Sequence, residues 1–270
     1  MKKILLFAKR NILEMIRDPL LYIFCVGFTV AMMLMFQIIV RYTPDGKTPV
    51  FYENSLTPGI IMFSFSLLML MSSLLVSKDR QSAFLKRLFS SPLKGYQFIL
   101  GYALPCMIIG LVQIIIGITC GYVFGTISGR GFCSFAYAML LFLEMIPALI
   151  INVSLGIMFG TILNDKSAPG ICSIFISACG VLGGAWMPLD TMGDFETTCG
   201  FLPFYETVYL GRCITGAIHT PTDEVSFVNP VVYSFSDRGW LYLGLLLGYT
   251  VLSVGLAIFA FTRKMKKDIQ

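Results

Sequence analysis

Residues 55–95 read SLTPGIIMFSFSLLMLMSSLLVS followed by KDRQSAFLKRLFSSPLKG, an uncharged apolar run and then a polar loop. The apolar run is 23 residues long, and about 20 apolar residues in a helix are enough to cross the hydrocarbon of a bilayer. The loop holds five of the chain's twenty basic residues and a single acid. The stretch therefore predicts a membrane-spanning helix that ends in a basic loop (residues 78–95).

The same pattern recurs along the whole chain. Hydrophobic residues make up 56% of the 270 residues and charged residues only 13%, about half the charged share of a typical soluble domain. Long runs with at most one charge cover residues 20–40, 55–77, 95–128, 131–163, 167–189 and 239–262. We therefore expect an all-α, polytopic membrane protein with six transmembrane helices, which form a single transmembrane domain over residues 1–270.

The charges are distributed unevenly between the two sides that six helices would define. The side that carries both termini and the basic loop would hold fifteen bases and five acids, whereas the other would hold five bases and nine acids. The positive-inside rule then predicts a protein of the cell membrane with both termini in the cytoplasm. No nucleic-acid partner is expected, because the basic clusters adjoin membrane boundaries, where anionic lipid headgroups account for them.

Two further segments are expected to be helical without crossing the membrane. In residues 1–18, apolar and charged side chains fall on opposite arcs of a helix, which is typical of an amphipathic helix lying on the inner leaflet. Residues 190–238 carry seven acids and an apolar stretch interrupted by Pro203, Glu206 and Arg212. We expect two short re-entrant or interfacial helices in this external region, and a solvated loop is the alternative.

The eight cysteines and the single histidine, His219, show no metal-binding pattern. None of the cysteines forms a CxxC pair, so a zinc site of the His/Cys type is not expected. Only Cys199 and Cys213 both fall in the external region of residues 190–238. The sequence allows either a disulfide between them or two free, buried thiols.

Glu144 is the only ionisable residue deep inside a predicted span. A charge at this depth is costly, so the side chain should face protein or water, or be protonated. Two interpretations stay open. Glu144 either contacts a substrate or a coupled cation, or it is a neutral acid hydrogen-bonded to a neighbouring helix near Pro147.

No motif for nucleotide binding or catalysis occurs in the chain. The phosphate-binding pattern GxxxxGK[ST] and the catalytic patterns HExxH and GxSxG are all absent from the sequence. We therefore expect no enzyme activity and no bound cofactor on this chain. An energy source for uphill transport would have to bind elsewhere.

The middle of the basic loop is amphipathic when it is read as a helix. Apolar side chains lie on one arc and Lys86, Arg87 and Ser90 on the other. The apolar arc contains Phe84, Leu85, Leu88 and Phe89. Such a helix is typical of a docking element, and binding to the inner leaflet alone is the alternative interpretation.

In their order and spacing, several segments together resemble the permease subunits of ABC-2 type exporters, which include drug, antibiotic, lantibiotic and polysaccharide export systems. The resemblance covers nearly the whole chain. It rests on the basic N-terminal helix, Thr57-Pro58-Gly59, the loop stretch KRLFSSPL at 86–93, GGAWMP at 183–188, and Leu202-Pro203 with Tyr209-Leu210-Gly211-Arg212.

This resemblance implies a homodimer or heterodimer of permeases, each resting on a separate cytosolic ATP-binding subunit that holds ATP and Mg²⁺. The N-terminal helix and the loop helix would seat in a groove of that ATPase. The docking residues of this coupling helix would be Phe84, Leu85, Lys86, Arg87, Leu88 and Phe89.

The resemblance also implies a translocation path between the two permeases, capped at its outer end by the 190–238 region. The residues expected along this path are Glu144, Trp186, Phe204 and Glu206. Aromatic and Met-rich spans fit an amphiphilic or hydrophobic substrate, as in multidrug resistance exporters, and ordinary lipid-facing packing is the alternative for most of these side chains. An ion-coupled secondary transporter or channel that uses Glu144 is the alternative, and a non-transport immunity or signalling protein is a third interpretation.

Overall fold

The structure is a computed structural model, and it describes residues 2–43, 51–81, 95–186, 189, 194–219, 225–226 and 239–269. These residues form helices and one short β-hairpin. In chain order the elements are α1 (Lys2–Arg17), α2 (Pro19–Leu21), η1 (Tyr22–Gly27), α3 (Phe28–Tyr42), α4 (Glu53–Gln81), α6 (Gly95–Ser128), α7 (Phe135–Ile162), α8 (Ala168–Leu182), α9 (Asp194–Cys199), α10 (Tyr205–Thr215), β1 (Ile218–His219), β2 (Val225–Ser226) and α12 (Gly239–Ile269).

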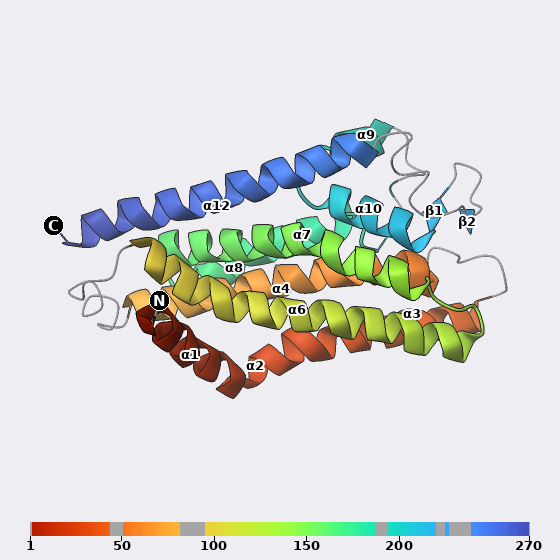
Figure 1. Cartoon of the computed structure of the whole chain (residues 1–270), viewed down its shortest axis with the longest axis horizontal. Helices are drawn as coiled ribbons and strands as arrows, with labels where there is room; N and C mark the ends of the chain where they lie inside the picture. Colours follow the sequence, from red (N-terminus) through yellow and green to blue (C-terminus); the bar gives the residue numbers. More distant parts are fainter. Residues whose placement is uncertain are drawn as a thin grey trace.

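The long helices lie side by side in an elongated bundle (Figure 1). Both chain termini lie at one end of the bundle, together with the end of α4 and the start of α6. We call this end the terminal end. The far end carries the end of α3, the start of α4 and the β1–β2 hairpin. The basic loop therefore leaves from and returns to the terminal end.

Five of the six expected helices are confirmed at a length and apolarity that can cross a membrane. They cover Pro19–Tyr42, Glu53–Gln81, Gly95–Ser128, Phe135–Ile162 and Gly239–Lys264. The sixth expected run, residues 167–189, contains the 15-residue helix α8, which is about 22 Å long at 1.5 Å per residue. It is shorter than expected because Gly183 and Gly184 follow it, and Gly184 turns the backbone with a φ of 67°.

Helix α4 is the core of the bundle. In the most apolar 18-residue segment of α4, 89% of the residues are buried, whereas in that of α12 only 17% are buried. Small residues let α7 approach it closely: a Cβ added at Gly156 would lie 2.5 Å from the carbonyl oxygen of Met69, and one at Gly160 would lie 2.4 Å from that of Ser73. The small residues four apart in α7 therefore serve packing within one chain.

The chain between α8 and α12 folds back against the bundle. Helix α10 is buried along its whole length and packs against α4, α7 and α12. Ile218 pairs with Ser226 in the antiparallel β1–β2 hairpin, a feature that the sequence did not predict. The two short helices α9 and α10 lie within the 190–238 stretch where two were expected.

Candidate functional site

Side chains from α1, α4 and α6 meet at the terminal end, directly beside the two ends of the basic loop. Arg10 of α1 donates from Nη1 and Nη2 to the two carboxylate oxygens of Asp79, at 2.8 and 2.9 Å. Tyr102 of α6 donates its hydroxyl to Asp79 Oδ2 at 2.9 Å. These three residues are the Asp79 cluster. Asp79 is almost completely buried, and its hydrogen bonds with Arg10 raise the pKa of the guanidinium.

Helix α1 fits closely on α6 because α6 has a glycine at the contact. The buried Asn11 donates Nδ2 to the carbonyl oxygen of Gly101 at 3.0 Å. The ring of Phe7 lies so close that a Cβ at Gly101 would be 2.2 Å from its Cδ1. Phe7 also meets Tyr102 edge to face, with ring centroids 5.0 Å apart. One face of α1 is thus fastened to the protein, while Leu5 and Leu6 on α1 stay exposed.

The last turn of α4 is also attached to the turn between α7 and α8. Arg80 donates to the carbonyl oxygen of Thr161 and, at 3.0 Å, to Asn164 Oδ1. Ser77 donates its hydroxyl to Asp165 Oδ1 at 3.3 Å. The start of the basic loop is therefore held from two sides, by α1 and α6 on one and by the α7–α8 turn on the other.

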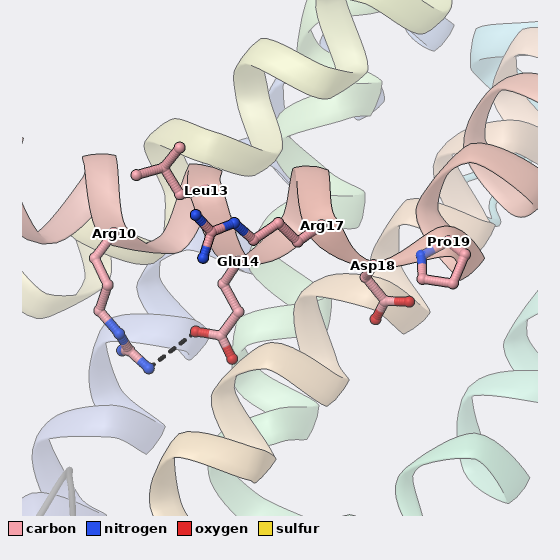
Figure 2. A pocket seen from close by; sticks show the side chains of 6 residues that line it. All are labelled: Arg10, Leu13, Glu14, Arg17, Asp18 and Pro19. Atoms are coloured by element: carbon pink, nitrogen blue, oxygen red, sulfur yellow. Dashed lines mark hydrogen bonds and ion pairs between the residues drawn. The ribbon is translucent and has the colours of Figure 1, made fainter.

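A surface hollow of about 690 Å³ lies along α1 beside the Asp79 cluster (Figure 2). It is lined by Arg10, Leu13, Glu14, Arg17, Asp18 and Pro19. Figure 2 shows Arg10 and Glu14 paired across one turn of α1, with a nitrogen–oxygen distance of 2.9 Å. Charges of both signs beside the exposed side chain of Leu13 suit contact with a polar protein surface.

The six predicted docking residues at 84–89 lie outside the described residues, so their role stays a prediction. Both flanks of the loop are described: α4 ends at Gln81 and α6 begins at Gly95. The Asp79 cluster ties these flanks to each other and to α1.

A second arginine–carboxylate pair closes the far end of α4. Arg130, in the turn between α6 and α7, donates to both carboxylate oxygens of Glu53 at 3.1 and 2.7 Å. It also donates to Gln37 Oε1 of α3 at 3.0 Å and lies over the ring of Tyr52, 4.5 Å from the centroid. Helix α4 thus has a buried carboxylate in its first turn and another in its last, each bound by an arginine from a different part of the chain.

Three stretches that carry the family resemblance meet around Arg212 of α10. Arg212 is 2% exposed and donates to the carbonyl oxygens of Ser55 at 3.1 Å and Gly184 at 2.7 Å. A Cβ at Gly59 would lie 2.7 Å from the carbonyl oxygen of Ala185. The start of α4, the turn after α8 and helix α10 are therefore locked into one junction.

Two of the predicted path residues lie beside this junction. Trp186 packs its ring against Phe63 and Phe36, with centroids 4.7 and 5.7 Å away. Phe204 is buried against Gly183, where a Cβ would lie 3.0 Å from the Phe204 Cβ. Both side chains are thus packed inside one chain.

The predicted path residue Glu206 lies on α10 and is fully buried. Neither of its carboxylate oxygens has a hydrogen-bond partner among the described residues. Burial raises the pKa of Glu206 to about 8, so the acid is mostly neutral at pH 7.

Glu144, the fourth path residue, lies on α7, as the sequence predicts. Both of its carboxylate oxygens are buried and, within the described part of the chain, lack a hydrogen-bond partner. The hydrogen bond to a neighbouring helix that one interpretation expected is therefore not present among these residues. The next residue, Met145, approaches α10 at Gly211, which places Glu144 one residue from the α7–α10 contact.

The cysteines of the 190–238 region form no disulfide. Cys199 and Cys213 are buried thiols, and both pack in the main apolar core. The structure therefore has the two buried thiols and not the disulfide. No group of three metal-ligating side chains is present among the residues that the structure describes.

The partners of the boundary charges were not predicted from the sequence. Asp79 was noted only as the single acid of the basic loop, and no role was predicted for Arg130 or Glu53. The position of these residues was the available clue. Each lies where an apolar run begins or ends, and an unpaired charge there would face hydrocarbon, so a partner is expected. Which acid meets which base depends on helix packing, and this is visible only in the fold.

Comparison with known families and proteins agrees with this architecture. A family model described as ABC-2 type transporter matches residues 2–214, from α1 to within α10. A comparison with curated proteins returned no match. Because the family match covers well over half of the chain and the fold is an all-α membrane bundle, the chain belongs to the ABC-2 type transporter family and is a membrane component of an ABC-type transporter.

Proposed function

We propose that this chain is the permease subunit of an ATP-driven ABC-2 type exporter. It would move an amphiphilic or hydrophobic substrate out of the cell with energy from a separate ATP-binding subunit. The observation that carries this proposal is the Asp79 cluster, because it joins α1 to both helices that flank the basic loop. A partner that binds this loop would act on three helices together.

The chemistry of the cluster suits the transmission of a force. Charge-assisted bonds from both nitrogens of one guanidinium fix geometry more strictly than neutral hydrogen bonds do. Asp79 lies two residues before the end of α4, and Tyr102 lies in the second turn of α6. A subunit seated on the basic loop and in the hollow of α1 would therefore displace α1, α4 and α6 as one unit.

The proposed complex contains two permeases, identical or homologous, and two ATP-binding subunits. ATP and Mg²⁺ would be held by those subunits, and this chain would hold neither. The protein would lie in the cell membrane with both termini on the cytoplasmic side, because the side of the protein that carries the termini has fifteen bases and five acids. The substrate path would lie between the permeases near Glu144, Trp186, Phe204 and Glu206.

The docking part of this proposal is tested by the double substitution Phe84→Asp with Leu88→Asp. We expect this variant to stay in the membrane and to lose the ATP-binding subunit during co-purification, because two charges would replace the apolar anchor. A control, Ser90→Asp, adds a charge to the polar arc and should keep the subunit. Retention of the subunit by the first variant would refute docking at this helix.

Glu144 supports a second candidate, an ion-coupled transporter or channel. Its two buried oxygens without a hydrogen-bond partner among the described residues could bind a proton or cation. Transport by the purified complex in vesicles separates the candidates. The exporter requires ATP and an ATP-binding protein in the complex. Transport that survives ATP depletion but stops when ion gradients collapse would favour the second candidate.

A further inference from the structure

An apolar groove of about 390 Å³ lies between α6, α7 and α12. Its floor consists of Val153, Ile157 and Ala257, each at most 2% exposed. Its rim consists of exposed side chains: Tyr96, Leu100 and Ile258. All three helices are long and apolar enough to cross a membrane, so the groove opens toward lipid. Water would find few hydrogen-bond partners on this apolar lining.

The length of the groove matches one leaflet of a bilayer. Along α6 its lining extends from Tyr96 to Met107, which is about 16 Å at 1.5 Å per residue. Half of the hydrocarbon thickness of a bilayer is about 15 Å. Tyr96 lies in the first turn of α6, at the terminal end, and interfacial tyrosines commonly mark the headgroup level. The groove therefore runs from this level toward the middle of the bilayer.

The width of the groove separates the candidate occupants. Its volume divided by its length gives a mean cross-section of about 24 Å². An α-helix with side chains has a diameter of about 10 Å and is too wide to enter. A single extended hydrocarbon chain is narrow enough. A helix from a second copy of the protein could place only side chains in the groove, whereas an acyl chain could lie along its whole length.

A base lies beyond the end of the groove where a headgroup would be. Lys264 is seven residues after Ala257 and hence on the same face of α12. It follows Ile258 by six residues, about 9 Å along the helix. Arg263 is exposed but lies nine residues after Val254, on the opposite face of α12. Asp268 is the one acid of α12 and follows Lys264 by four residues, whereas four bases lie in the same stretch, Arg263, Lys264, Lys266 and Lys267, so this end of α12 carries a net positive charge.

We propose that this groove binds one acyl chain of a phospholipid whose anionic headgroup pairs with Lys264. The lipid is a resident of the terminal-end leaflet and is not the transported substrate. The proposal goes beyond the proposed function and does not depend on it. The bound chain would fill the space between α12 and the α6–α7 pair and so hold α12 on the bundle.

Native mass spectrometry of the purified protein tests this site. The full chain, with any subunit that remains bound, is mixed with equimolar phosphatidylglycerol and phosphatidylcholine in mild detergent. We expect retained phosphatidylglycerol to exceed phosphatidylcholine roughly fivefold, since one base near an anionic headgroup contributes about 1 kcal/mol of binding free energy. In Lys264→Gln this preference should fall to about one while lipid is still retained, whereas Arg263→Gln, on the opposite face of α12, should keep the preference.

A matched pair of substitutions on α12 tests the groove itself. Val254→Trp fills the groove and should abolish lipid retention, whereas Leu252→Trp changes an exposed residue on the opposite face of the same helix and should leave lipid retention unchanged. Ala103→Phe fills the groove from α6 and should act like Val254→Trp. Equal retention by the filling variants and the wild type would overturn the proposal. So would a shift from dimer to monomer in the filling variants, which would identify the groove as a contact between copies.

Discussion

Replacing Asp79 by Asn tests the Asp79 cluster, because Asn keeps the shape of the side chain and removes its charge. The change weakens two bonds from Arg10 and one from Tyr102. Hydrogen bonds to a charged group contribute about 1.5–3 kcal/mol each. The Arg10 side chain is 37% exposed, so solvent screens its share. We expect the free energy of unfolding to fall by about 2 kcal/mol.

The assay is a double-mutant cycle with Arg10→Gln, measured by reversible unfolding in mixed detergent micelles. Residues in direct contact should show a coupling energy of about 1 kcal/mol. The far-end pair provides a matched control, because Arg130 and Glu53 have the same bidentate chemistry. A cycle with Arg130→Gln and Glu53→Gln should give a similar coupling energy and leave co-purification of the proposed ATP-binding subunit unchanged.

A coupling energy below about 0.3 kcal/mol for Arg10 and Asp79 would refute the reasoning, because it would show that the two residues act independently. Loss of the ATP-binding subunit in both cycles would show a general loss of fold. We expect the ATP-binding subunit to be lost only in the variants of the Arg10–Asp79 cycle.

Two further predictions concern packing and pH. Gly156→Ala should lower the free energy of unfolding by about 1–3 kcal/mol, because its Cβ would lie 2.5 Å from the carbonyl oxygen of Met69. Gly244→Ala, with no heavy atom within 4 Å, should change it by at most about 1 kcal/mol, and equal effects in the same unfolding assay would contradict this. Burial raises the pKa of Glu206 to about 8, above the roughly 4.3 of an unfolded chain, so the folded state holds an extra proton between these pH values. The wild type should therefore lose stability as pH rises through this window, by up to about 1.4 kcal/mol per pH unit, and Glu206→Gln should remove that slope; superimposable pH profiles would count against a buried neutral acid.

The helices of the fold could be predicted because length and apolarity alone decide them. The run 95–128 corresponds to α6 residue for residue, and 55–77 lies inside α4. The lipid environment makes this prediction possible, because a backbone that crosses hydrocarbon must satisfy its hydrogen bonds internally and therefore forms a helix. The run 167–189 shows the limit of this reasoning. Gly183 and Gly184 count as apolar, yet they allow the turn that ends α8.

The candidate site was predictable only as a position along the chain. The amphipathic pattern marks the basic loop as a place for docking, but no periodicity indicates that Asp79 meets Arg10, 69 residues earlier. The same holds for Arg212, whose partners are the backbone carbonyl oxygens of Ser55 and Gly184. Backbone oxygens leave no trace in a sequence, so such a contact requires the fold.

The two arginine–carboxylate pairs give α4 a specific mechanical role. Glu53 and Asp79 are 26 residues apart, which is about 39 Å along the helix. Between them α4 is buried and meets α7 through small residues that allow almost no gap. Pro58 lies inside α4, five residues after Glu53, and is the one proline of this helix. A displacement at the basic loop would therefore be carried from Asp79 to Pro58 and would reach Glu53, and through Arg130 the helix α3, only across this proline. Bond strength at the two ends, together with any bend at Pro58, would then decide how much of a movement at the terminal end reaches the far end.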